Sequence, residues 1–212
     1  MARSRYYKGA QATLQGPHFN NPTGGAYLPG SEHSSPLEVS SPYGKGIHFT
    51  SHPRVASRWA PVVLEVEVLG ETFLIPEQVA PRYRNDIPDS LAMGKYNKYR
   101  TDRLRVLRII GVATYSWMGR SGSLAEASRV TRDLNLTLRR AGLLEVERTG
   151  RSLQRLRDDG FVLWGIDDPN AQPASKAPTR RIEKVDLTYK GRTEKVLLSE
   201  LPVSVIERLT RR

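Results

Sequence analysis

Two aromatic side chains, His48 and Trp59, follow a pair of closely spaced glycines, Gly44 and Gly46. Glycines at this spacing let the backbone turn tightly and leave room for a ligand to approach the main chain. The chemistry that this stretch suits is therefore ligand binding close to the backbone. We expect residues 44–60 to present His48 and Trp59 to a shared cleft, and the rest of the chain to be organised around it.

Three short elements are expected to position these side chains. Residues 47–49 have the character of a short strand, and the spacing becomes helical from Pro53. Residues 62–69 then alternate as a strand with one apolar side. On the helix, one face would carry Val55, Ala56 and Trp59, and Arg54 and Arg58 would lie near the other.

The flanking segments predict more strands and two long loops. Strands are expected at residues 5–10, 71–76 and 104–112, the last with both faces partly covered. Residues 15–43 are dense in Gly, Pro, Asn and Ser, so they form either a lid or binding loop or a disordered segment. Residues 77–95, which contain Pro81, Pro88 and Gly94, are expected to be a loop.

The second half of the chain changes from strands to helices. Ser123 and Glu126 have the spacing of a capping box, and Gly142 supplies a stop signal, so a helix is expected between them. A shorter helix over 150–159 and a buried strand over 161–166 should follow. The inward positions of the first helix would be Ala127, Val130, Leu134, Leu138 and Ala141.

The C-terminal part predicts a linker and a small unit. Residues 167–179 are rich in Pro, Ala, Ser and Asn, as linkers are. A hairpin around residues 190–191 and a short helix that turns Val203, Ile206 and Leu209 inward come next. A hairpin with one helix is marginal alone, so we expect it to dock on a protein partner, on a second copy or on the main body.

These elements predict an α+β fold with four parts. Residues 1–118 would form the main domain, 119–166 a helical extension packed on it, 167–179 a linker, and 180–212 a basic hairpin–helix docking segment.

Composition limits the function classes. The chain has 212 residues and no cysteine, which excludes disulfides, thiolate catalysis and cysteine-based zinc sites. The 33 Lys and Arg against 22 Asp and Glu give a net charge of +11, which favours polyanionic partners such as nucleotides or nucleic acid. With no apolar run long enough to span a bilayer and no signal-like N-terminus, we expect a cytoplasmic protein without a membrane, or one packaged in a viral particle.

Residues 44–49, Gly-Lys-Gly-Ile-His-Phe, followed by Trp59, resemble the central motif of ADP-ribosyltransferases of the poly-ADP-ribose polymerase and diphtheria-toxin type. In that family two aromatic residues at these positions hold the nicotinamide ring of NAD between them. Lys8-Gly9 is similar to the family's first motif, His-Gly, and Tyr96-Asn97-Lys98-Tyr99 is similar to its third, Tyr-Asn-Glu-Tyr. The resemblance covers roughly residues 5–110.

This resemblance implies a compact split antiparallel sheet, NAD as the cofactor, and a set of site residues. Gly9 would hold the carboxamide, His48 and Trp59 would enclose the ring, and Lys8 and Lys98 would contact ribose or phosphate. Lys98 stands where the family has a glutamate that steadies the developing ribosyl cation. A lysine there opposes the transition-state charge, so the resemblance implies nucleotide binding with compromised ADP-ribosyl transfer or NAD hydrolysis.

Several alternatives remain open from the residues alone. Trp59 can be simple core, and His48 can be an outward residue of an alternating strand. Glu65, Glu67 or Glu71 can supply a displaced carboxylate or form a solvated face. A metal site is not expected, because His48 and His52 lack ligand-like spacing. A serine hydrolase is not expected either, because the chain has no nucleophile elbow.

Two other functions compete with nucleotide binding. The first is a nucleic-acid-binding module that uses helix arginines for phosphate contacts. The second is a catalytically inactive structural or accessory protein, for instance in a virion, that uses the fold as a scaffold. The arginines of the first alternative are Arg129, Arg132, Arg139 and Arg140.

Overall fold

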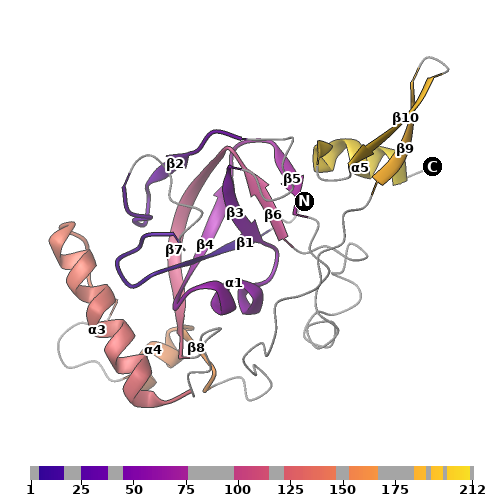
Figure 1. Cartoon of the computed structure of the whole chain (residues 1–212). Coiled ribbons are helices and arrows are strands. Elements are labelled where there is room, and N and C mark those ends of the chain that lie inside the picture. The colour runs from indigo at the N-terminus through magenta and orange to yellow at the C-terminus, as the bar shows by residue number, and fades with distance from the viewer. Residues whose placement is uncertain are drawn as a thin grey trace.

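A computed structural model describes residues 5–16, 25–37, 45–75, 98–114, 122–146, 153–166, 184–189, 192–197 and 200–210 of the chain. The expected loop 77–95, the linker 167–179, and Tyr96 and Asn97 lie outside these ranges. Within the ranges the chain is a mixed α+β structure built on a mostly antiparallel open sheet, which confirms the expected class (Figure 1).

The elements are β1 (Tyr6–Ala10), β2 (Glu32–Ser34), β3 (Ile47–Thr50), α1 (Pro53–Trp59), β4 (Val62–Val68), β5 (Thr72–Leu74), β6 (Lys98–Thr101), β7 (Arg103–Ala113), α3 (Leu124–Arg140), α4 (Leu153–Asp158), β8 (Val162–Trp164), β9 (Lys184–Tyr189), β10 (Arg192–Leu197) and α5 (Val203–Thr210).

The main sheet has the strand order β2-β7-β4-β1-β3-β6-β5, with β8 paired to β7. All of its pairs are antiparallel except β7 with β8, which run parallel. The pairing of β1 with β3 is confined to one position, Tyr7 opposite Thr50, whereas β1 and β4 pair over five positions from Tyr6 to Ala10. The sheet is therefore weakly joined between β1 and β3, next to Gly9 and His48.

The two faces of the sheet differ, because successive side chains of a strand point to opposite sides. One side, which we call the core face, carries Lys8 and Ala10 of β1, opposite Leu64 and Val62 of β4. The other side carries Tyr7 and Gly9, opposite Glu65 and Val63. We call it the α1 face, because α1 packs there, with Ala56 against Val63.

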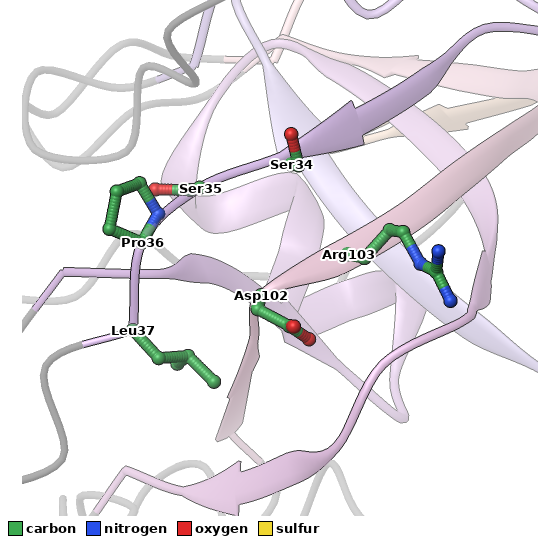
Figure 2. A pocket seen from close by; sticks show the side chains of 6 residues that line it. All are labelled: Ser34, Ser35, Pro36, Leu37, Asp102 and Arg103. Carbon is green, nitrogen blue, oxygen red and sulfur yellow. The ribbon is translucent and has the colours of Figure 1, made fainter.

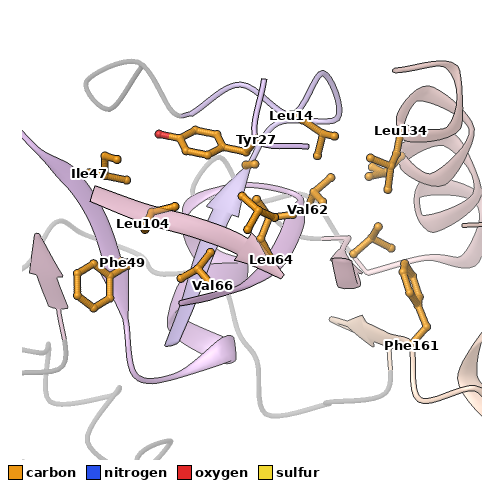
Figure 3. Close-up of a cluster of buried hydrophobic side chains, with 14 of the residues drawn as sticks. Leu14, Tyr27, Ile47, Phe49, Val62, Leu64, Val66, Leu104, Leu134 and Phe161 are labelled. Atoms are coloured by element: carbon orange, nitrogen blue, oxygen red, sulfur yellow. The ribbon is translucent and has the colours of Figure 1, made fainter. Parts of the chain in front are cut away.

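The core face holds the larger hydrophobic cluster, and α3 covers it. Leu134 of α3 lies near Phe161 at one end of the cluster, and Ile47 and Phe49 of β3 lie at the other end (Figure 3). At about 25 cal/mol per Å² of apolar area removed from water, burial of a side chain the size of Leu134 contributes about 2 kcal/mol. This cluster joins the helical extension to the sheet.

The helix α3 begins and ends as its sequence predicts. The Ser123 side chain accepts a hydrogen bond from the backbone N–H of Glu126 at 3.1 Å, which satisfies one donor of the first turn. Gly142 follows the helix with a φ of 70°, a left-handed conformation that glycine adopts without strain. Ala141, expected to point inward, is instead exposed, because it is the last residue before this turn.

The structure corrects two other expectations. Residues 32–34, placed in an irregular segment, form β2, whose central residue His33 lies opposite Leu104 on the core face. Three residues are too few for alternation to be visible in the sequence. Arg58, expected near the exposed side of α1, is only 7% exposed.

The C-terminal segment docks on the main body. Pro202 forms an isolated bridge with Phe73 of β5, and Ile206 of α5 is buried in the main cluster. The β9–β10 hairpin and α5 lie beyond β5, at the opposite end of the molecule from α3, α4 and β8 (Figure 1). The helix α5 therefore contacts the main body, and docking of the segment on a protein partner or a second copy stays a prediction.

No helix within the described ranges is long and apolar enough to cross a membrane.

We expect Ser123→Ala to destabilise the protein by about 1 kcal/mol, because the Glu126 amide loses its acceptor. For a chain of this length the thermal midpoint should fall by about 2–4 °C. A thermal melt followed by circular dichroism measures this change. Ser128→Ala, at an exposed position inside the same helix, is the matched control and should not lower the midpoint. Equal midpoints for Ser123→Ala and the parent would contradict the capping role.

Candidate ligand-binding face of the sheet

Helix α1 lies directly on β1 at Gly9. A Cβ atom built on Gly9 would lie 2.5 Å from the backbone oxygen of Ala56, 3.1 Å from the nitrogen of Ala60 and 3.3 Å from the Trp59 Cβ. Contacts of 2.5 Å do not occur for real Cβ atoms, so any side chain at position 9 would force the helix outward. Gly9 therefore fixes where α1, and with it Trp59, lies on the sheet.

Trp59 meets Lys98 on this face. Thr50 of β3 lies opposite both Tyr7 of β1 and Lys98 of β6, so Lys98 points to the α1 face. Its Nζ lies 5.5 Å from the centroid of the Trp59 ring, a distance at which the ring attracts a cation. Burial lowers the pKa of Lys98 to about 8, although part of its side chain is exposed.

His48 points to the same face as Gly9 and Lys98. It lies opposite Arg100 of β6, two residues from Thr50, and is half-buried. Three predicted site residues, Gly9, Trp59 and Lys98, are thus in one connected group, and His48 lies on the same side of the sheet. The enclosure of a ring between His48 and Trp59 stays a prediction.

Lys8 does not share this face. Its side chain lies on the core face with 1% exposure, and its Nζ is 4.7 Å from the centroid of the Tyr27 ring. It donates a hydrogen bond of 3.2 Å to the backbone oxygen of His48, and burial lowers its pKa to about 7. Lys8 therefore reaches the candidate site only through the β3 backbone, and a direct contact of Lys8 with a ribose or phosphate on the α1 face would require a rearrangement.

Two further cations lie on or against the α1 face. Arg100 is fully buried, with its guanidinium 5.9 Å from the centroid of the Phe73 ring, and Arg58 of α1 is almost fully buried. Sequence reasoning did not select either residue. The strand period identifies Arg100, because it is two residues from Lys98 and so shares its face. Lys98 and Arg100 thus belong to β6 and point to the α1 face, and Arg58 belongs to the helix that packs on that face.

The carboxylates considered as replacements for a catalytic glutamate are engaged elsewhere. Glu65 accepts a hydrogen bond from Arg108 at 2.7 Å and lies 3.8 Å from Arg5. The pKa of Tyr7 is raised, mainly by burial and in addition by the negative charge of Glu65. Glu67 pairs with Arg105 at 3.2 Å. By register Glu65 is three strands from Lys98, which is about 14 Å at the usual strand spacing. Glu71 is exposed in the turn between β4 and β5.

Two of the four helix arginines of the nucleic-acid alternative form ion pairs with acidic side chains. Arg129 pairs with Glu126 at 2.7 Å and Asp133 at 3.2 Å, which raises the pKa of the guanidinium. Arg139 pairs with Glu145 at 2.8 Å. Arg132 and Arg140 are exposed on the same helix.

A separate open pocket of about 500 Å³ lies where β2 ends and β6 turns into β7 (Figure 2). Asp102 and Arg103 line it at the turn, and a short run from Ser34 to Leu37 lines it as well. Leu37 also packs on Gly46, where an added Cβ would lie 2.9 Å from its Cδ2. The pocket therefore adjoins the start of the 44–60 stretch, but the predicted site residues do not line it.

In the part of the chain that the structure describes, no three His, Asp or Glu side chains gather as a metal site requires. No protein-family model, curated protein or solved structure matches this chain.

We expect Gly9→Ala to destabilise the protein by about 1–3 kcal/mol, because α1 must move away from β1. Urea unfolding followed by tryptophan fluorescence measures the change. Thr13→Ala, at an exposed position a few residues downstream, should stay within about 0.5 kcal/mol of the parent. Unchanged stability for Gly9→Ala would show that α1 does not lie as closely on β1 as the structure has it.

Proposed function

We propose that the chain binds NAD, or a related nucleotide, on the α1 face of the sheet between α1 and β6. The observation that carries this proposal is the group formed by Gly9, Trp59 and Lys98. Gly9, which has no room for a side chain, lets α1 pack directly on β1. This packing positions Trp59, whose ring lies 5.5 Å from the Lys98 ammonium.

The nicotinamide ring of NAD suits the face of Trp59. The oxidised ring carries a positive charge, and an indole face attracts cations through its quadrupole. Lys98 occupies that position at 5.5 Å in the free protein. The ring of NAD would take its place over Trp59, and the ammonium would turn toward the phosphates. His48, on the same side of the sheet, would close the ring from its second face.

Two further features support a nucleotide. The ladder between β1 and β3 is confined to Tyr7 and Thr50, so the Gly9 backbone lies beside a weakly paired stretch, where a carboxamide can bond to the main chain. Arg58 and Arg100, both buried, are positively charged residues of α1 and of the α1 face of β6, which makes the local potential more favourable for a pyrophosphate without a direct contact. The ADP-ribosyltransferase type of split sheet is part of this proposal.

Binding is better supported than catalysis. Cleavage of the nicotinamide–ribose bond builds positive charge on the ribose, which a carboxylate would stabilise and Lys98 opposes. Glu65 and Glu67 are held by arginines away from Lys98. Transfer of ADP-ribose or hydrolysis of NAD by this chain therefore has less support than binding of the nucleotide.

The two alternative functions have less support on this chain. Nucleic-acid binding through α3 would rely on Arg132 and Arg140, since Arg129 and Arg139 already pair with acidic side chains. A scaffold role, with the β9–β10 hairpin meeting a protein partner or a second copy, is the fallback if no nucleotide binds.

Calorimetric titration of NAD into the protein tests the proposal. We expect binding by the parent, loss of about tenfold or more in affinity for Trp59→Ala, and partial retention for Trp59→Phe, because phenylalanine keeps an aromatic face. Arg132→Ala removes one exposed positive charge far from the site and should bind like the parent. Absence of binding by the parent at millimolar NAD, or equal loss in Trp59→Ala and Arg132→Ala, would contradict the proposal.

The sign of the charge at position 98 should control any cleavage of NAD. We expect nicotinamide release to increase in the order parent, Lys98→Gln, Lys98→Glu, because the first change removes an opposing charge and the second adds a stabilising one. Release is measured by chromatography after incubation with NAD, with binding of NAD to each variant as the control. A parent that releases nicotinamide faster than Lys98→Glu would overturn this role of Lys98.

A further inference from the structure

A second group of polar residues lies where residues 25–37, which include β2 and which we call the strap, meet the core face. The strap crosses the core face and is held by backbone hydrogen bonds, from Tyr27 to Leu14 and from Gly30 to Val106, both of 2.8 Å. Tyr27 of the strap is fully buried, and His33 of the strap and Lys8 of β1 are at most 4% exposed. The Tyr27 ring is 4.7 Å from Lys8 Nζ and 4.4 Å from the His33 ring. Two basic side chains thus share one buried space with a tyrosine.

The hydrogen bonds of His33 determine which ring nitrogen carries the hydrogen of the neutral imidazole and which nitrogen can take up a proton. Ser31 donates its hydroxyl hydrogen to the backbone oxygen of Leu28, so its Oγ accepts from His33 Nε2 at 2.6 Å. The neutral imidazole therefore carries its hydrogen on Nε2. The other nitrogen, Nδ1, is buried without a hydrogen-bond partner in the described structure. A proton taken up by Nδ1 would create a buried N–H with no acceptor.

The surroundings of Lys8 offer little compensation for charge. Within the described residues, its Nζ has one hydrogen-bond acceptor, the backbone oxygen of His48, and lies over the Tyr27 ring. Among the described residues, the neighbouring strands turn apolar, aromatic or hydroxyl side chains toward the core face. The acidic residues of these strands, Glu32, Glu65 and Glu67, lie on the α1 face and pair with Arg105, Arg108 and Arg5. On α3, Asp133 pairs with Arg129. The other groups facing this space are Tyr6 and Tyr99.

We propose that Lys8 and His33 form a buried proton-sensitive lock, which holds the strap on the core face while both side chains are uncharged and loosens it when they take up protons. The lock lies on the opposite face of the sheet from the proposed nucleotide site, and the hydrogen bond from Lys8 to the His48 backbone connects the two. Since the strap adjoins the pocket at Ser34–Leu37, loosening it would also alter that pocket.

The direction in which pH changes the stability of the folded protein follows from the pKa values of Lys8 and His33. Burial lowers the pKa of Lys8 to about 7, and burial together with the charge of Lys8 lowers the pKa of His33. In each case the unfolded state holds its proton more tightly than the folded state. The folded protein therefore becomes more stable as pH rises from about 7 toward the ordinary lysine value, and it loses further stability below the ordinary histidine value.

Urea unfolding at pH 6 to 9.5 compares the parent with Lys8→Met, which keeps the length of the side chain without its charge. Between pH 7 and 9.5, the ratio of the unfolding constant of the parent to that of Lys8→Met should fall by up to about tenfold per pH unit. Lys98 titrates in both proteins and cancels in this ratio. Lys45→Met, which removes an exposed lysine, should keep the profile of the parent. A ratio that stays constant with pH would overturn the proposal.

Hydrogen exchange of the parent gives a second test, which holds even if Lys8→Met does not fold. Protection factors of the Tyr27 and Gly30 amides, corrected for intrinsic rates, should be lower at pH 6 than at pH 8.5 by at least about tenfold. Amides in the middle of α3, such as that of Leu134, should change less. Equal protection of the strap at both pH values, or an equal loss in strap and α3, would contradict a local lock.

Discussion

The close approach of α1 to β1 at Gly9 is the constraint on which the candidate site depends. With the Ala56 oxygen 2.5 Å from where a Cβ would be, the helix lies as near to the sheet as a backbone can. That distance sets the height of Trp59 above β1 and β3. It also brings the indole within reach of Lys98 on β6, three strands and nearly forty residues further along the chain. Without the glycine the helix would move outward, and the tryptophan would lose this neighbour.

The same sheet separates two environments for basic residues. On the α1 face, Lys98 lies over the Trp59 ring and Arg100 lies near the Phe73 ring, while Arg58 is buried in α1. On the core face, Lys8 lies against Tyr27, which in turn packs against His33, and Lys8 donates a hydrogen bond to the backbone of His48. A chain with net charge +11 thus buries several of its cations instead of leaving all of them in water. Desolvation of such groups costs free energy, so their retention needs a reason, which we place in ligand binding on one face and in pH sensitivity on the other.

Much of this arrangement is predictable from the sequence where local signals are strong. The alternation of residues 62–68, the Ser123 cap and the glycine after α3 each act within a few residues, and the structure has these elements close to the expected bounds. The resemblance to three ADP-ribosyltransferase motifs placed Gly9, His48, Trp59, Lys8 and Lys98 in one site. Gly9, Trp59 and Lys98 lie together, His48 shares their side of the sheet, and Lys8 does not. The family itself and the NAD site remain predictions.

What could not be predicted depends on long-range packing. The strand at Glu32–Ser34 is too short to show a period, and it exists because β7 offers an edge for it. Lys8 was assigned to the site because Lys8-Gly9 resembles the His-Gly motif of the family, but adjacent residues of a strand point to opposite faces. The helical period shows which residues of a seven-residue helix share a side, but not which of its sides other parts of the chain cover. The burial of Arg58 could therefore not be predicted from the sequence.

The central claim is that Trp59 on the α1 face receives the ring of NAD. Two-dimensional ¹⁵N NMR of the tryptophan indole groups during a titration with NAD tests this claim most directly. We expect the Trp59 indole signal, assigned by its absence in Trp59→Phe, to shift in a saturable way as NAD is added. Saturable binding of NAD that leaves the Trp59 signal unchanged would contradict the account.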